Sequence, residues 1–228
     1  MIASVHIADV GTGGALRLLR DRPRLVAPRG AQYVELTTTV PLSRHLLPRL
    51  TLGRVGLIAA WDSDRALDEF LACDPLAEQL AHGWHVRLAP TRIVGAWSKL
   101  DGLVREEVPM AGDEPAAVLT LGRLRLSQTF RFLKASAAAE DLALRDQALL
   151  ASTALARPPS LVATFSLWKS TSAMRAYARG DVNEGHVAAT RAHARQPFHH
   201  ESAFIRFRPY DSAGSWDGND PLATPPAA

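Results

Sequence analysis

The sequence predicts an α+β fold in which a ferredoxin-like unit, of element order βαββαβ, occurs twice and forms a single-chain α+β barrel. The first observation is an internal repeat: the block Trp61–Phe70 recurs as Trp168–Tyr177, 107 positions further along the chain (168 minus 61). A period near half the chain length indicates two fused copies of one small unit. The second observation is that an apolar run precedes both blocks, at 55–60 and 161–167.

The first copy contains four predicted strands and two predicted helices. Alternating apolar residues predict the strands, and Pro41 ends the strand that is rich in threonine and valine. Ser63 has the character of a helix N-cap, and Pro23 ends the shorter helix. The predicted elements are strand 2–10, helix 15–22, strand 32–40, strand 54–61, helix 63–81 and strand 84–97.

The second copy follows a linker at 98–115 and repeats the same order. Pro158 and Pro159 break the chain between its two middle strands. Its predicted elements are strand 117–123, helix 127–145, strand 148–155, strand 161–168, helix 170–180, a further helical stretch at 184–195 and strand 203–208. The predicted divisions are a first half at 1–104, a second half at 115–210 and a disordered tail at 211–228, where Asp, Ser, Gly and Pro dominate.

A ferredoxin-like sheet carries its helices on one face and leaves the other face open. Two such sheets that face each other solve this problem, and here one chain would supply both. Phe165 and Leu167 would then line a central cavity. The space between the sheets is the default ligand site.

The composition narrows the class of protein. At 228 residues and 47% hydrophobic content, the chain fits a globular protein. Its apolar runs are shorter than the roughly 20 residues that cross a bilayer, and its N-terminus does not have the pattern of a secretion signal, so we expect a cytoplasmic location. The single cysteine, Cys73, fits a reducing compartment. The scattered basic residues argue against nucleic-acid binding, and the net charge of +3 leaves room for peripheral contact with an anionic membrane.

Other catalytic patterns fit poorly. Gly11–Gly14 begins like a dinucleotide fingerprint, but Leu16 stands where the third glycine belongs. His186 and His193 are seven residues apart, so their backbones would lie about 10 Å apart along a helix, too far for one shared ion. No G-x-S-x-G nucleophile motif is present.

His186 is the remaining candidate for chemistry, because only the second copy has a histidine there; the first copy has Gln79. A haem iron needs only one protein ligand, so a lone histidine fits haem. The competing interpretation is a packing or surface histidine on an amphipathic helix.

Several segments of the second copy carry a family pattern, spread over about 117–208. They are Phe130–Ser136, Leu149–Ala151, Thr164–Ser170, Ala173–Ala178, His186, Phe198–Glu201 and Phe204–Phe207. With these segments the chain resembles the spheroidene monooxygenase family, the acyclic carotenoid ketolases of the dimeric α+β barrel superfamily. The resemblance implies a haem enzyme that inserts oxygen from O2 into a long apolar polyene. Repeated hydroxylation of one carbon and loss of water then yield a ketone.

The resemblance also implies roles for individual residues. His186 becomes the candidate axial haem ligand, and Lys169 and Arg206 become candidate anchors for the haem propionates. The candidate pocket residues are Phe132, Phe165, Trp168, Tyr177, Phe198 and Glu201. The expected partners are a hydrophobic substrate and an external electron donor, with the chain as monomer or homodimer. The alternatives are a haem enzyme of another class, such as a dehydratase or peroxidase, and a non-catalytic barrel that binds haem or an apolar ligand.

Overall fold

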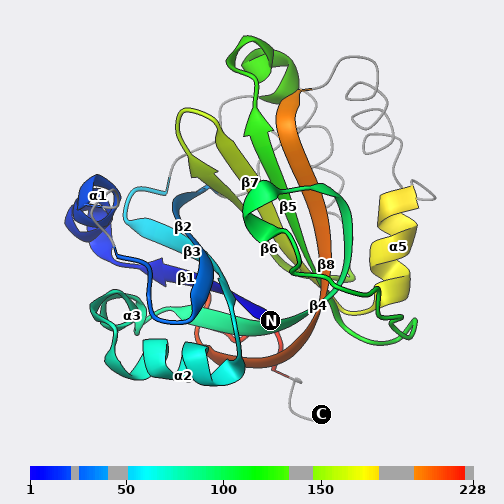
Figure 1. Cartoon of the computed structure of the whole chain (residues 1–228), viewed down its shortest axis with the longest axis horizontal. Coiled ribbons are helices and arrows are strands. Elements are labelled where there is room, and N and C mark those ends of the chain that lie inside the picture. Colours follow the sequence, from blue (N-terminus) through cyan, green and yellow to red (C-terminus); the bar gives the residue numbers. More distant parts are fainter. Residues whose placement is uncertain (22–25, 41–50, 134–145, 180–197, 224–228) are drawn as a thin grey trace. The chain divides into compact units, whose positions relative to one another are not determined.

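The structure is a computed structural model that describes residues 1–21, 26–40, 51–133, 146–179 and 198–223 (Figure 1). The chain forms two compact units. The first contains 1–38, 52–90 and 209–228, and the second contains 39–51 and 91–208. The units therefore differ from the predicted halves, because the chain passes from one unit to the other inside strands and not only at the linker.

The first unit contains an antiparallel sheet in the order β4–β1–β3–β2 and three helices. Each predicted strand of the first half is present within one or two residues of its predicted bounds. The elements are β1 (Ile2–Asp9), α1 (Gly11–Asp21), β2 (Ala31–Val40), β3 (Arg54–Trp61), α2 (Asp64–Cys73), α3 (Pro75–Leu80) and β4 (Trp84–Ala96).

The predicted helix at 63–81 is two helices, α2 and α3, which lie next to each other in Figure 1. Ser63 caps α2 as predicted, since its side chain accepts a hydrogen bond from the Ala66 amide. The break falls at Asp74, because the residue before a proline is pushed into an extended conformation, here φ −86° and ψ 130°. Asp74 then caps α3 by accepting from the Leu76 amide.

The helices of the first unit cover one face of its sheet. Alternate residues of β3, including Leu57 and Trp61, form a buried core with Leu67 and Phe70 of α2. This face is set by the two-residue period of a strand, which places every second side chain toward the helices. We call it the α2 face.

The second unit contains an antiparallel sheet in the order β6–β7–β5–β8. Its elements are β5 (Ala116–Leu124), β6 (Leu149–Arg157), β7 (Leu161–Trp168), α5 (Thr171–Arg179) and β8 (His199–Gly214), with short 3-10 turns at Ser98–Leu100 and Leu126–Gln128. The predicted helix at 127–145 begins at residue 129, and its part from 134 onward lies outside the described residues. The predicted helical stretch at 184–195, with His186, lies outside them too.

The two sheets are built to one plan. Trp61 at the end of β3 opposes Ile2 of β1, and Trp168 at the end of β7 opposes Ala116 of β5. A helix follows each tryptophan, α2 in one unit and α5 in the other. The predicted fold class, an α+β fold made from a duplicated ferredoxin-like unit, is confirmed.

The segment after residue 210 differs from the predicted disordered tail. Strand β8 continues to Gly214, and the side chain of Trp216 packs on that of Trp84 with ring centroids 5.3 Å apart. Asp220 accepts hydrogen bonds from Trp84 Nε1 at 2.9 Å and from Ser212 Oγ at 2.8 Å. The Asp and Ser residues that suggested disorder therefore act as hydrogen-bonding groups; residues 224–228 lie outside the described part.

Within the described ranges, no helix is both long enough and apolar enough to span a lipid bilayer.

Candidate functional site

Helix α5 packs against one face of the second unit's sheet, which we call the α5 face. Met174 of α5 lies in a buried cluster with Ala116, Val118 and Trp168. Residues that oppose each other in an antiparallel pair point to the same face. The register of β5 with β7 and β8 therefore assigns the other side chains of the sheet to this face or to the opposite one.

Two predicted pocket residues meet on the α5 face. The rings of Trp168 and Tyr177 have centroids 4.9 Å apart and an interplanar angle of 40°. Trp168 Nε1 donates a hydrogen bond to Ser166 Oγ at 3.0 Å, so its indole edge is satisfied within the strand. The pair is an apolar contact with a satisfied indole N–H, and Trp168 itself is buried.

Phe132 and Phe198, two further predicted residues, lie together with the imidazole of His199. Their ring centroids are 6.2 Å apart, and that of Phe132 is 5.2 Å from that of His199. The histidine ring lies over Gly122, where an added Cβ would come within 2.5 Å of His199 Nε2. Gly122 has the same strand parity as Val118, so this aromatic group also lies on the α5 face.

Arg206 is a buried cation on the same face, because it opposes Val118 in the β5–β8 pair. It is 7% exposed, and its Nε donates to Thr91 Oγ1 at 3.2 Å. The Thr91 hydroxyl in turn donates to the Arg206 carbonyl oxygen at 3.0 Å. Among the residues that the structure describes, the Arg206 guanidinium has no carboxylate within ion-pair distance.

The electrostatic surroundings of Arg206 are positive. Burial lowers the pKa of its guanidinium, and the charges of Arg175 and Arg92 lower it further, while Glu107 acts in the opposite direction. Glu107 itself pairs with Arg92 at 3.3 Å. The site therefore favours an anion.

The remaining predicted residues do not join this group. Phe165 opposes Leu119 and points to the opposite face, where it is fully buried. Glu201 accepts hydrogen bonds from the Ser98 amide at 2.5 Å and from Arg123 at 3.2 Å. Burial raises the pKa of Glu201, but these partners outweigh it and hold the pKa below its usual value. Lys169 is exposed at the end of β7, and the placement of His186 lies outside the described residues.

The sequence did not point to Thr91, Arg92 or Arg175 as site residues. Thr91 and Arg206 are 115 positions apart, and no motif spacing connects them. The repeat was the available signal, because it makes Arg175 the equivalent of Asp68 in the first copy (68 plus 107).

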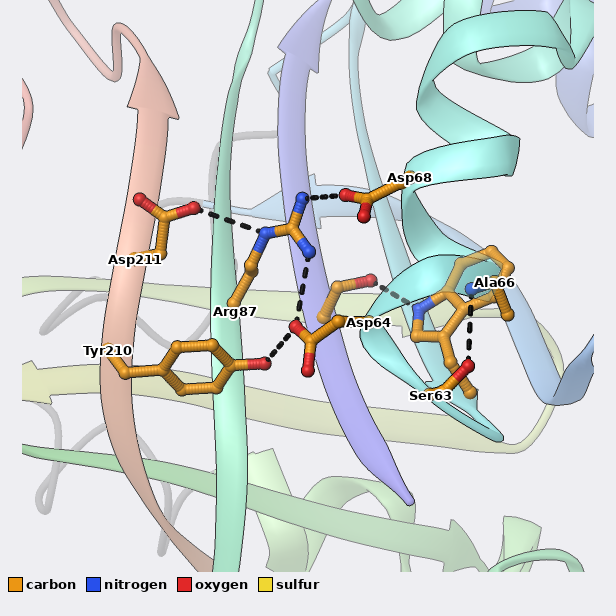
Figure 2. A network of polar contacts seen from close by, with 9 residues as sticks. Ser63, Asp64, Ala66, Asp68, Arg87, Tyr210 and Asp211 are labelled. Carbon is orange, nitrogen blue, oxygen red and sulfur yellow. Dashed lines mark hydrogen bonds and ion pairs between the residues drawn. The ribbon is translucent and has the colours of Figure 1, made fainter.

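The α2 face of the first unit contains a polar network instead (Figure 2). Arg87 of β4 pairs with Asp64 at 3.2 Å, with Asp68 at 2.5 Å and with Asp211 at 3.1 Å. Tyr210 donates a hydrogen bond to Asp64 at 2.6 Å and is the main reason that the pKa of Asp64 is lowered. The guanidinium of Arg87 is thus neutralised within the protein.

A hydrogen-bond chain lies beside this network. Trp61 Nε1 donates to Ser4 Oγ at 2.9 Å, and the Ser4 hydroxyl lies 2.9 Å from His6 Nε2. The Ser4 hydroxyl can accept from the indole and at the same time donate to His6 Nε2, an arrangement that suits a neutral imidazole. Burial, followed by the charges of His85 and Arg87, lowers the pKa of His6 to about 3.

Two other features were considered as ligand sites. In the described part of the chain, no group of three or more His, Cys, Asp or Glu side chains is arranged to hold a metal ion. A surface hollow of about 150 Å³ in the first unit is bordered by Pro28, Tyr33 and Leu76, among others, and contains none of the predicted site residues.

Comparison with known proteins gives relatives of one kind. No protein-family model matches the chain. It is 32% identical over 176 residues to spheroidene monooxygenase of Rubrivivax gelatinosus, covering 75% of this chain and 66% of the relative. It is 27% identical over 179 residues to spheroidene monooxygenase of Rhodobacter capsulatus, covering 74% and 72%. The predicted resemblance is confirmed, although the match spans just under two thirds of the first relative's length.

A solved structure shows the fold independently. Aldoxime dehydratase in complex with butyraldoxime aligns with a TM-score of 0.53 over 92% of this chain and 79% of its own. The two sequences are 10% identical, so the likeness concerns the fold alone.

Proposed function

From its relationship to the spheroidene monooxygenases, we propose that this protein is a haem-dependent monooxygenase that hydroxylates or ketolates a long, hydrophobic, carotenoid-like molecule. The names of the relatives support the oxygenase class and the polyene substrate. The observation that carries the haem assignment is the α5 face. It combines aromatic surface with a buried cation that has no carboxylate partner among the described residues.

The residues of this face fit haem in chemical terms. Haem has a broad apolar ring and two propionate carboxylates, and the aromatic side chains of Trp168, Tyr177 and Phe198 lie on the face that contains Arg206. His186 would hold the haem iron. When bound, haem supplies the iron at which O2 is activated.

The protein's own residues would bind and orient the haem and the hydrophobic substrate. The aromatic side chains exclude water and hold apolar groups by contact area, and Arg206 fixes a carboxylate. Lys169, exposed at the end of β7, is proposed as a second anchor.

Each hydroxylation consumes one O2, two electrons and two protons, and releases one water, so the proposal requires an external electron donor. A cytoplasmic location with peripheral membrane contact stays a prediction, as does a monomer or homodimer.

The first test is spectroscopic. Purified protein mixed with haem is expected to show an intense Soret band, and His186→Ala is expected to weaken haem binding or displace the band. His200→Ala, at an exposed position in the same half, is the matched control and should behave as the wild type. A Soret band that is unchanged in His186→Ala would remove that residue as the ligand.

The second measurement separates an oxygenase from a carrier. With haem, a reductant and a carotenoid extract, the proposal requires O2 consumption that depends on the carotenoid, together with a hydroxylated or ketolated product. Haem binding without such a product would show a binding protein or a haem enzyme of another reaction class.

A further inference from the structure

The two copies place an arginine at the same position of their sheets. In the first, Arg87 of β4 opposes Ser4 of β1; in the second, Arg206 of β8 opposes Val118 of β5. Ser4 and Val118 are each two residues after the residue that opposes the repeated tryptophan, Ile2 and Ala116 respectively. Arg87 and Arg206 are therefore equivalent by the chain's own duplication.

The first copy neutralises its arginine from the neighbouring helix. Asp64 and Asp68 lie one turn apart on α2 and both reach Arg87, and Asp211 adds a third carboxylate (Figure 2). This is the arrangement that a mostly buried cation requires, because an unpaired charge removed from water is costly.

The second copy removes both helical carboxylates. The positions on α5 that correspond to Asp64 and Asp68 are Thr171 and Arg175 (64 and 68, each plus 107). Thr171 donates its hydroxyl proton to the Glu114 carbonyl oxygen at 3.0 Å, and Arg175 adds a charge of the same sign as that of Arg206. The second copy thus has the equivalent arginine, and it has a neutral group and a like charge at the positions of the two helical counterions.

The remaining contact fixes the guanidinium without neutralising it. Within the guanidinium, Thr91 accepts only from Nε, and the two Nη groups donate to no hydrogen-bond acceptor among the described residues. Two adjacent N–H groups in one plane match the two oxygens of a carboxylate. Thr91 is therefore a positioning residue, and the Nη groups are left for a ligand.

We propose that Arg206, held by Thr91 and reinforced by Arg175, is a carboxylate-binding subsite, in which a bound ligand takes the place of the Asp64–Asp68 pair of the first copy. This deepens the proposed function, on which it rests, by assigning a haem propionate as that carboxylate.

The first experiment needs no cofactor and uses the duplication as its control. Arg87→Met should lower the melting temperature of the apoprotein, since it leaves three carboxylates without their cation. Arg206→Met should leave it unchanged or raise it by about 2–4 °C, because it removes a buried charge that has no carboxylate partner among the described residues. If both variants lower the melting temperature equally, Arg206 stabilises the fold as Arg87 does, and the inference is overturned.

The second experiment compares haem with haem dimethyl ester, whose propionates carry no charge. The wild type should bind haem about tenfold more tightly than the ester, the range of one charge-assisted carboxylate contact. Arg206→Met should lose most of this preference and keep only the part due to the second anchor, Lys169, and Thr91→Val should reduce the preference while the charge of Arg206 remains. Equal binding of haem and ester by the wild type overturns the inference and leaves haem binding intact, whereas no Soret band with either form overturns the proposed function.

A third variant rebuilds the first copy in the second. Arg175→Asp restores a carboxylate at the position of Asp68 and should raise the melting temperature of the apoprotein. It should also weaken binding of haem more than binding of the ester, because the internal carboxylate competes with the propionate. If Arg175→Asp prefers haem over the ester as strongly as the wild type does, the assignment of this subsite is contradicted.

Discussion

Replacement of Gly214 by alanine is expected to lower the free energy of unfolding by about 3–5 kcal/mol, combining the cost of a left-handed backbone with that of overpacking. Gly214 has φ +88°, and a Cβ there would come within 1.9 Å of the Gly83 carbonyl oxygen. That obstacle is backbone at the entrance to β4, so it cannot be relieved by rotating a side chain. The Trp216–Trp84 contact that follows should be lost with it. Denaturant unfolding followed by tryptophan fluorescence measures both effects.

Gly218 provides a matched control four residues later. It also has a positive φ, +91°, but nothing lies within 4 Å of the position of its Cβ. Gly218→Ala should therefore cost only the backbone strain, about 1 kcal/mol. Equal costs for the two variants would show that the close approach of Gly214 to Gly83 contributes nothing to the stability of the first unit.

The strands and the duplication could be predicted because they depend on local patterns. Period-2 alternation marks the strands, and the recurrence of Trp61 as Trp168 marks the two copies without any knowledge of contacts. The break between α2 and α3 also had a local signal, Asp74 before Pro75, which the apolar periodicity of the 63–81 segment obscured. The sequence therefore contained the signal that divides the predicted helix at 63–81 into two.

The site could be predicted only in part, because its contacts are long-range. Trp168 ends β7 and Tyr177 lies in the helix that follows, so the two are close in sequence, whereas Arg206 contacts Thr91 across 115 positions. Which face of a strand a residue occupies depends on register, and a shift of one residue exchanges the faces. For this reason Phe165 was grouped with Trp168 although the two point in opposite directions.

The C-terminal segment shows how composition misleads. Asp, Ser and Gly are typical of disordered chains, yet here they make specific contacts: Asp211 pairs with Arg87, Asp217 with Arg54, and Asp220 binds Trp84. Such residues satisfy polar groups of a folded surface only when a partner lies nearby. That partner belongs to another part of the chain, which a local window does not include.

The duplication makes the asymmetry between the copies informative. The sequence indicated a difference at His186, which the first copy replaces with Gln79. The structure adds a second difference at the equivalent arginines: Arg87 pairs with carboxylates, and Arg206 pairs with none among the described residues. The first copy thus has a closed charge network, and the second has the equivalent arginine that we propose for ligand binding.

Acid is expected to destabilise the first unit through His6. Its pKa in the folded protein is about 3, below the ordinary value of 6.5, so between these values the unfolded chain binds a proton that the folded chain excludes. The stabilisation from the neutral imidazole is complete above pH 6.5 and is lost as the pH falls below it. At 1.36 kcal/mol per pH unit, the loss reaches about 2 kcal/mol at pH 5.

His6→Gln should remove most of this pH dependence, because an amide side chain can still hydrogen-bond with the Ser4 hydroxyl but does not titrate. The measurement is the difference in unfolding free energy between pH 7.5 and pH 5, which should shrink by about 2 kcal/mol in the variant. Some slope should remain, since burial also lowers the pKa of the neighbouring His85. His82→Gln, at an exposed position of the same unit, should keep the wild-type pH dependence. If His6→Gln retains the full wild-type pH dependence, the acid sensitivity arises at other groups, and the buried Trp61–Ser4–His6 chain does not govern the acid stability of this unit.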